Sequence, residues 1–272
     1  MMNQITNDVI KAITAVRSKA PLVHNITNYV TVNDCANAVL AIGASPIMAD
    51  DILEAADITA ISSALVINIG TLNQRTIASM VAAGKRANEL GIPVVLDPVG
   101  AGASALRNDT VKTLLEQVRM SIIRGNISEV GFLAGLQVST KGVDAAESDA
   151  GNDAVAVAKV VAARFHCVAA ITGAIDVISD GTRVVKIHNG HPMLSKVTGT
   201  GCMTTALVGS FAGAADPFTA AVGGIASMGI AGELAYEQAG RLGTGSFHIG
   251  IIDALSRLDA ELIEERAKLY EE

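Results

Sequence analysis

The segment VTGTGC, residues 197–202, places a cysteine directly after a glycine-rich turn and before a run of small apolar residues. Glycines permit close approach and unusual φ values, and free N–H groups at a helix N-terminus favour an anion. Such a turn would stabilise the negative charge on a phosphoryl group during its transfer, or on the oxyanion of a leaving group. The same position should depress the pKa of the Cys202 thiol. The alternative is a plain helix entry with a buried cysteine, and the sequence contains no Walker A loop.

Two carboxylates, Asp97 and Glu129, each follow an apolar run that predicts a strand. A pair of carboxylates near phosphates would hold Mg²⁺, with waters intervening, because Mg²⁺ keeps much of its hydration. In a purely structural interpretation, Asp97 caps the turn before Pro98 and Glu129 completes a capping box with Asn126. Both interpretations stay open.

Other polar or sulfur-bearing side chains stand at the ends of predicted strands. Arg124 could clamp phosphates with its guanidinium, or be an ordinary surface arginine. Thr172 either donates a hydrogen bond to a ligand or simply ends a strand. Met48 either lines an apolar pocket or packs in the hydrophobic core. Asn28 and His24 are pocket candidates that could equally satisfy loop backbone groups. The five histidines show no HExxH spacing, and a GxSxG elbow is absent, which counts against an α/β-hydrolase.

These residues need a scaffold, and the chain alternates short apolar runs with helical stretches. This alternation predicts an α/β fold with a mostly parallel sheet covered by helices on both faces. Ligands bind beyond the carboxyl ends of strands in such sheets. With no internal repeat and no low-complexity linker, residues 1–272 are predicted to form a single domain. Strands are predicted over 21–27, 45–49, 63–70, 92–97, 121–126 and 167–173. Helices are predicted over 3–18, 31–42, 50–61, 72–90 and 109–119, with an exposed loop at 137–151, then another helix, and mostly helix from 203 onward. An Asp-Gly pair at 180–181 predicts a short antiparallel hairpin.

Composition limits the partners. Half of the 272 residues are apolar, only 3% are aromatic, and the net charge is −7 without a basic cluster. This argues against nucleic acid or an anionic membrane surface as a partner. Three separated cysteines indicate neither a disulfide framework nor a zinc site, and favour the reducing cytoplasm. The apolar region after Cys202 is interrupted by Asp216-Pro217, so a soluble protein without a membrane span is expected.

Seven segments together closely resemble the hydroxyethylthiazole kinase family, ribokinase-like enzymes that salvage the thiazole half of thiamine. They run in order from about Pro21 to Phe247, nearly the whole chain: PLVHNITNYV, GASPIMA, VINIGTL, LDPVGAGA, IRGNISE, AITG and KVTGTGC. The resemblance implies an ATP- and Mg²⁺-dependent phosphotransferase acting on the primary alcohol of 4-methyl-5-(2-hydroxyethyl)thiazole. It also implies a homotrimer with sites between subunits, in which Met48 acts on a neighbour's active site.

The same resemblance implies roles for individual residues. Cys202 stands where most ribokinase-like enzymes place an aspartate base, and it would serve as a weak base or as a group that positions the hydroxyl. The turn from Gly199 to Gly201 would form the anion hole. The remaining implied contacts are Gly199, Met48 and Asn28 with the thiazole, Arg124 and Thr172 with ATP, and Asp97 and Glu129 with Mg²⁺.

Three alternatives come from other functional classes. One is an ATP- or ADP-dependent dehydratase that repairs hydrated nicotinamide cofactors, and another is a kinase for the pyrimidine half of thiamine. Both carry an aspartate in the glycine turn, so Cys202 counts against them, and HNITNYV also counts against the dehydratase. The third is a catalytically silent thiazole-binding protein, which is favoured only if Asp97, Glu129 and Arg124 do not cluster.

Overall fold

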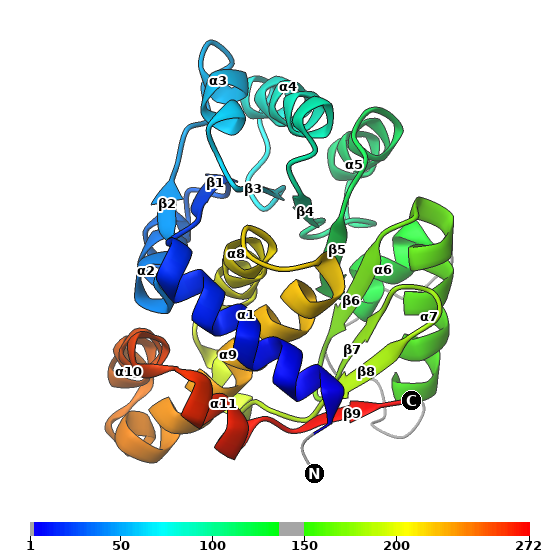
Figure 1. Ribbon diagram of the computed structural model, residues 1–272. Helices are drawn as coiled ribbons and strands as arrows, with labels where there is room; N and C mark the ends of the chain where they lie inside the picture. The colour runs from blue at the N-terminus through cyan, green and yellow to red at the C-terminus, as the bar shows by residue number, and fades with distance from the viewer. Residues whose placement is uncertain (1–2, 136–149) are drawn as a thin grey trace.

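The computed structural model describes residues 3–135 and 150–272 (Figure 1). Its described residues contain a nine-stranded sheet with the order β2-β1-β3-β4-β5-β6-β7-β8-β9. The strands are β1 (Leu22–Ile26), β2 (Ser45–Ile47), β3 (Ala64–Asn68), β4 (Val94–Asp97), β5 (Ile122–Asn126), β6 (Val168–Thr172), β7 (Asp176–Ser179), β8 (Val184–Ile187) and β9 (Leu269–Glu271). Strands β2 to β6 in this order are parallel, which confirms the predicted fold class.

Helices cover both faces of the sheet. One face carries α1 (Gln4–Lys19), α2 (Val32–Ile42), α8 (Thr200–Ala212), α9 (Pro217–Ala239), α10 (Thr244–Arg257) and α11 (Ala260–Arg266). The other carries α3 (Ala55–Ala60), α4 (Gln74–Leu90), α5 (Ala105–Gln117), α6 (Ile127–Leu133) and α7 (Ala150–Phe165). Side chains alternate along β3 accordingly: Val66 packs in the first core, whereas Leu65 and Ile67 pack in the second. A strand buried on both faces is typically a continuous apolar run, here the four residues ALVI that precede Asn68.

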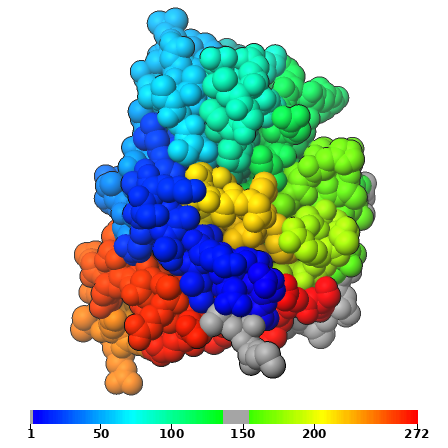
Figure 2. Space-filling model, in the orientation of Figure 1, coloured from blue at the N-terminus to red at the C-terminus, as the bar shows by residue number. Residues whose placement is uncertain are grey.

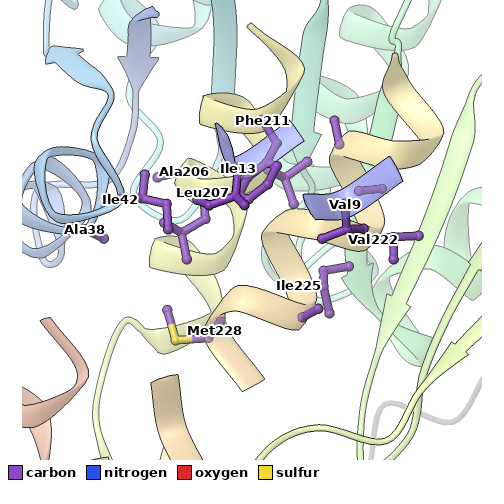
Figure 3. Close-up of a cluster of buried hydrophobic side chains, with 14 of the residues drawn as sticks. Val9, Ile13, Ala38, Ile42, Ala206, Leu207, Phe211, Val222, Ile225 and Met228 are labelled. Atoms are coloured by element: carbon purple, nitrogen blue, oxygen red, sulfur yellow. The ribbon is translucent and has the colours of Figure 1, made fainter. Parts of the chain in front are cut away.

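Helix α8 lies close against the sheet because its residues are small. A Cβ on Gly209 would stand 2.3 Å from Cγ2 of Val66 in β3, so only glycine permits this approach. Figure 3 shows Ala206, Leu207 and Phe211 of α8 packed among side chains of α1, α2 and α9. This packing fixes the N-terminus of α8 at the carboxyl edge of the parallel strands, where the glycine turn begins.

The antiparallel part of the sheet is larger than the predicted hairpin. Strands β7 and β8 form that hairpin, and the N–H groups of Thr182 and Arg183 both donate to Asp180 Oδ1 in its turn, at 2.9 and 2.7 Å. The short C-terminal strand β9 pairs antiparallel with β8 and was not predicted. Its three residues are too few to show a periodicity in the sequence.

Several helix boundaries differ from the predictions. Helix α3 starts at Ala55 rather than near residue 50, and α5 starts at Ala105, where Ser104 caps it by accepting from the Arg107 N–H at 3.4 Å. The exposed loop predicted at 137–151 falls almost wholly on residues 136–149, outside the described residues, and Ala150 already belongs to α7.

Helix α9 begins at the Asp216-Pro217 pair that was expected to interrupt the apolar region. Asp216 Oδ1 accepts from the Phe218 and Thr219 N–H groups at 3.1 and 3.2 Å, and Pro217 occupies the first helical position. Among the described residues, the segment Pro217–Leu242 is long and apolar enough to cross a membrane, but 94% of its most apolar window is buried inside the molecule. Its composition is therefore accounted for by its place in the core.

Candidate functional site

The carboxyl edge of the parallel strands gathers most of the predicted site residues. Asn68 and Asp97 end β3 and β4 and stand opposite each other in the strand register. Asn68 Nδ2 donates to Asp97 Oδ2 at 2.9 Å, and Thr205 Oγ1 donates to the same oxygen at 2.7 Å. Asp97 is almost fully buried, so these donors and the nearby Arg124 replace the water that its carboxylate has lost.

Cys202 joins this group from the first turn of α8. Its Sγ lies 3.2 Å from Asn28 Nδ2 and 3.3 Å from Asn68 Nδ2, so two amide donors converge on the sulfur. Asn28 follows β1 and is itself buried. Cys202 is half-buried, and the yellow segment around residue 200 reaches the surface between blue, cyan and green segments in Figure 2.

Arg124 links the glycine turn to β6. Its Nη1 donates to the carbonyl oxygen of Gly201 at 3.0 Å and lies 3.8 Å from Asp97 Oδ2, while Nη2 donates to Thr172 Oγ1 at 2.7 Å. The guanidinium is buried, and among the described residues its Nε has no partner. A water or an anionic ligand would supply the partner that this buried donor lacks.

Glu129 forms the predicted capping box at the start of α6. Its Oε2 accepts from the Asn126 N–H at 2.9 Å, and Asn126 Oδ1 accepts from the Glu129 N–H at 2.9 Å. Its Oε1 also accepts from the Gly100 N–H at 2.8 Å, which ties α6 to the loop after β4. The structural interpretation of Glu129 as part of a capping box is thus confirmed. In this position the Glu129 carboxylate also lies near Asp97, whose pKa its charge raises.

Gly199 has a φ of 89°, in the left-handed region that favours glycine. A Cβ on Gly199 would stand 2.5 Å from Cγ2 of Thr31, so the turn packs directly on the segment after β1. The N–H groups of the first turn of α8 have no intrahelical partner and point out of the helix end. The turn can therefore present them to an anion.

The Cys202 thiol does not have the depressed pKa that its helix position predicted. Burial raises its pKa, and the nearby negative charge of Asp97 raises it further, against the opposing hydrogen bonds from Thr31, Asn68 and Asn28. Burial likewise raises the pKa of Asp97 to about 6, although Arg124 opposes the shift. For Cys202, desolvation outweighs the hydrogen bonds to the sulfur because the sulfur lies among buried groups.

Comparison with known proteins decides the family. Residues 13–261 match the sequence profile of the hydroxyethylthiazole kinase family. The chain belongs to the hydroxyethylthiazole kinase family. A hydroxyethylthiazole kinase from Ruminiclostridium cellulolyticum is 65% identical over 99% of this chain and 100% of its own length.

Solved structures agree with this family assignment. The hydroxyethylthiazole kinase protein from Pyrococcus horikoshii is 41% identical, covers 98% of this chain and 99% of its own, and superposes with a TM-score of 0.90. A ribokinase-like superfamily protein from Enterococcus faecalis covers 96% of this chain and 99% of its own, with a TM-score of 0.64 and 8% identity. The second likeness shows the ribokinase-like fold alone.

Met48 and His24 lie on the β2 side of this edge. Met48 directly follows β2 and packs, half-buried, against the first core. Cys202 is also partly buried against this core. His24 is fully buried, with Nε2 2.7 Å from the Ala49 carbonyl and Nδ1 2.8 Å from Thr59 Oγ1. Burial lowers its pKa, so this histidine holds the backbone after β2 as a neutral ring.

Three polar residues of this edge had been given no role from the sequence. Thr205 stands three residues after Cys202, and this helical spacing placed it on the same face of α8. Arg107 clamps two loops together, because its guanidinium donates to the carbonyls of Ile69 at 2.7 Å, Gly70 at 2.8 Å and Val99. Asn68 was visible as a polar residue ending an apolar strand, but only the register shows that it faces Asp97.

A separate groove of about 480 Å³ lies at the opposite edge of the sheet, before β5 and β6. Its lining includes Arg119, His166 and Arg183. Arg183 is already paired with Asp180 at 2.8 Å, and none of the predicted site residues lines this groove. The candidate chemistry belongs to the carboxyl edge.

Proposed function

We propose that this chain transfers the γ-phosphoryl group of ATP to the primary alcohol of 4-methyl-5-(2-hydroxyethyl)thiazole, giving the phosphate ester and ADP in thiamine salvage. The observation that carries this proposal is the 65% identity, over essentially the full length, to a protein named hydroxyethylthiazole kinase. The clustering of Cys202, Asp97 and Arg124 at one edge supports it, and it removes the main reason to favour a catalytically silent binder.

Cys202 positions the acceptor hydroxyl in this proposal. The raised pKa keeps its sulfur a thiol at neutral pH, which favours positioning over the role of general base. Phosphoryl transfer passes through a loose transition state in which bond formation to the alcohol lags, so the alcohol proton need not leave early. A hydrogen-bonding thiol is then sufficient to hold the hydroxyl in line.

The nucleotide phosphates lie against Arg124 and the glycine turn. Arg124 holds the turn through Gly201 O and holds Thr172 through its hydroxyl, and its unpartnered Nε is free to donate to a phosphate. The N–H groups of the turn from Gly199 to Gly201 stabilise the charge that develops during transfer. Thr172 contacts the same phosphates beside Gly173.

Asp97 and Glu129 hold Mg²⁺ in this proposal. Among the described residues, no three His, Cys, Asp or Glu side chains gather as a ready-made metal site. Two carboxylates nevertheless suit Mg²⁺, which commonly takes one or two carboxylates together with waters and substrate phosphates. Both are close enough for the charge of Glu129 to raise the pKa of Asp97. When bound, the ion neutralises negative charge on the phosphates.

The thiazole ring lies among Asn28, Met48 and Gly199. Gly199 and Asn28 meet the same segment after β1: Gly199 packs on Thr31, whose N–H donates to Asn28 Oδ1 at 3.2 Å. Met48 offers an adaptable apolar wall for a sulfur-containing aromatic ring. Met48 directly follows the edge strand β2, and in this proposal it forms a wall of a neighbouring subunit's site.

The protein forms a homotrimer with its sites between subunits. Several large apolar side chains are exposed in the segments that precede and follow the edge strand β2 in the chain, and Leu53 is 88% exposed. Exposed apolar clusters of this kind mark protein–protein contacts. The residues concerned are Tyr29, Val30, Leu40, Ile52, Leu53 and Ile61.

The enzyme works in the cytoplasm. Its three cysteines, Cys35, Cys167 and Cys202, are all free thiols. Free thiols are the usual state in a reducing compartment.

A coupled assay for ADP release tests the proposed function. The full-length protein is supplied with ATP and Mg²⁺ and with hydroxyethylthiazole, hydroxymethylpyrimidine or no acceptor. We expect ADP only with the thiazole alcohol. Release of ADP with the pyrimidine alcohol would show that the substrate is the pyrimidine half of thiamine. No release with either alcohol would contradict the proposal.

A further inference from the structure

Asn68 makes four hydrogen bonds at the centre of the candidate site and is only 2% exposed. Its Nδ2 donates to Asp97 Oδ2 at 2.9 Å and points to Cys202 Sγ at 3.3 Å. Its Oδ1 accepts from the Gly70 N–H at 2.9 Å and from Asn28 Nδ2 at 3.1 Å. The Asn68 side chain thus contacts both the Cys202 thiol and the Asp97 carboxylate. In the proposed reaction the thiol positions the acceptor hydroxyl, and the carboxylate holds Mg²⁺.

The orientation of this amide is fixed by partners that cannot reverse their roles. The Gly70 N–H can only donate, so Oδ1 must face it, and the ionised form of Asp97 can only accept, so Nδ2 must face that. Gly70 also has to be glycine, because its Cβ would stand 2.9 Å from Asn68 Oδ1 and 3.0 Å from Asn28 Cβ. The loop after β3 is therefore shaped around the two amides.

Asn28 is oriented by the same logic. Its Oδ1 accepts from the Thr31 N–H at 3.2 Å and from Thr31 Oγ1 at 3.1 Å, which turns its Nδ2 toward Asn68 and the sulfur. Two N–H donors therefore face Cys202 Sγ. A thiol that accepts from both must direct its own S–H away from them, so the amides determine where that hydrogen points.

We propose that Asn68 is a positioning residue that sets the orientation of the Cys202 thiol and couples it to Asp97. This inference rests on the proposed function for its place in the reaction. Asn68 itself touches no substrate. It acts through the Cys202 sulfur, which holds the acceptor hydroxyl, and through the Asp97 carboxylate, which faces the nucleotide phosphates.

Asn68→Asp tests the inference, because it keeps the shape of the side chain and the oxygen that faces Gly70 while removing both N–H donors. We expect kcat for the thiazole alcohol to fall about 100-fold with KM for ATP changed less than about threefold. A second readout needs no turnover: the pH profile of Cys202 alkylation by iodoacetamide, followed by mass spectrometry of its peptide. In Asn68→Ser, which removes the N–H donor to the sulfur without adding a charge, this profile should move upward by more than about half a pH unit.

Asn88→Asp is the matched control, since Asn88 bridges the Arg119 backbone at the opposite edge of the sheet with bonds of 2.9 and 2.6 Å. It should leave both readouts at their wild-type values. Asn68→Ser, smaller and uncharged, serves where the added carboxylate prevents folding, with kcat expected to fall at least about 10-fold. An Asn68 variant with wild-type kcat, or with an unmoved alkylation profile, overturns the inference. Wild-type protein that releases no ADP with the thiazole alcohol overturns the proposed function instead, and the alkylation profiles then decide the Asn68 contact alone.

Discussion

At the scale of single residues, Cys202 shows two opposing influences on one sulfur. The first turn of α8 and two amide donors favour negative charge on it, while burial and the charge of Asp97 oppose that charge. Burial prevails, and the sulfur remains a thiol near neutral pH. The phosphoryl acceptor is a neutral alcohol, which a neutral thiol can orient without a charge that would repel the incoming phosphates.

Replacing Cys202 by Ser should slow turnover without unfolding the protein. The hydroxyl is smaller than the thiol and its oxygen lies closer to Cβ, so the two amide contacts at 3.2 and 3.3 Å lengthen. We expect kcat to fall about 10- to 100-fold, with a melting temperature within a few degrees of wild type. Cys167→Ser makes the same change at the opposite edge and should keep wild-type kcat. Full kcat in Cys202→Ser would exclude any role for the sulfur in catalysis.

A second buried acid, Asp176, predicts a pH dependence of stability. Its Oδ1 accepts from the Gly173 N–H at 2.9 Å, and burial raises its pKa from the usual 3.8 to about 7. Between these two values the folded protein holds a proton that the unfolded chain has lost. The contribution of Asp176 to the free energy of unfolding therefore falls as pH rises from about 4 to 7, by at most about 1.4 kcal/mol per pH unit.

Asp176→Asn removes this titration while an amide oxygen can still accept from Gly173. Relative to wild type, the variant should gain stability steadily as the pH is raised from about 5 to 7, with no further gain above about pH 8. Urea unfolding at several pH values measures the difference. A constant difference across this range would mean that Asp176 is already ionised in the folded protein at the lowest pH.

At the scale of elements, the glycine turn before α8 combines two constraints that can be separated. Gly91, at the end of α4, has a φ of 72° and nothing within 4 Å of the position that a Cβ would take, so alanine there meets backbone strain alone. Gly199, with a φ of 89°, adds a contact of 2.5 Å with Thr31. The two glycines thus form a matched pair.

We expect Gly91→Ala to lower the free energy of unfolding by about 1–2 kcal/mol and to keep wild-type kcat. Gly199→Ala should lower the free energy of unfolding by about 1–3 kcal/mol more than Gly91→Ala does, because Thr31 must move. Its kcat should fall at least about 10-fold, since Thr31 orients Asn28 beside Cys202. Urea unfolding measures both losses. Equal losses of stability in the two variants would show that Thr31 can move away from the added Cβ without lowering the free energy of unfolding.

The elements that were predicted well from the sequence are those with local signals. Gly43 and Gly91 mark the ends of α2 and α4 at positive φ, and the Asn126–Glu129 spacing marks the start of α6. Strand β9 carries no such signal, because its pairing with β8 joins segments that lie far apart in the chain. The interruption predicted at Asp216-Pro217 is confirmed by the break between α8 and α9, although the pair was not assigned as the start of a helix.

At the scale of the whole molecule, the candidate site depends on contacts between strands rather than on any one segment. The positions of Cys202, Asp97 and Arg124 could be predicted from strand ends and from family resemblance. Asn28 was also predicted as a pocket residue, but its hydrogen bond with Asn68 was not, because the two amides meet only through the register of β1, β3 and β4. Nor could the reversed pKa shift of Cys202 be predicted, because desolvation depends on groups that only the folded chain brings around the sulfur.

The proposed trimer gives the apolar surface beside β2 a function, and it can be tested by breaking that surface. Leu53→Asp places a charge at a side chain that is 88% exposed, where it costs the isolated subunit little but opposes burial between subunits. Light scattering should give three times the chain mass for wild type and the mass of a single chain for Leu53→Asp. Activity should fall with the mass, because Met48 lies near this edge and would serve a neighbour's site. Leu90→Asp, with the side chain 47% exposed at the end of α4, is the control and should remain trimeric and active. A wild-type protein with the mass of one chain and full activity would show that each site is complete within its own subunit.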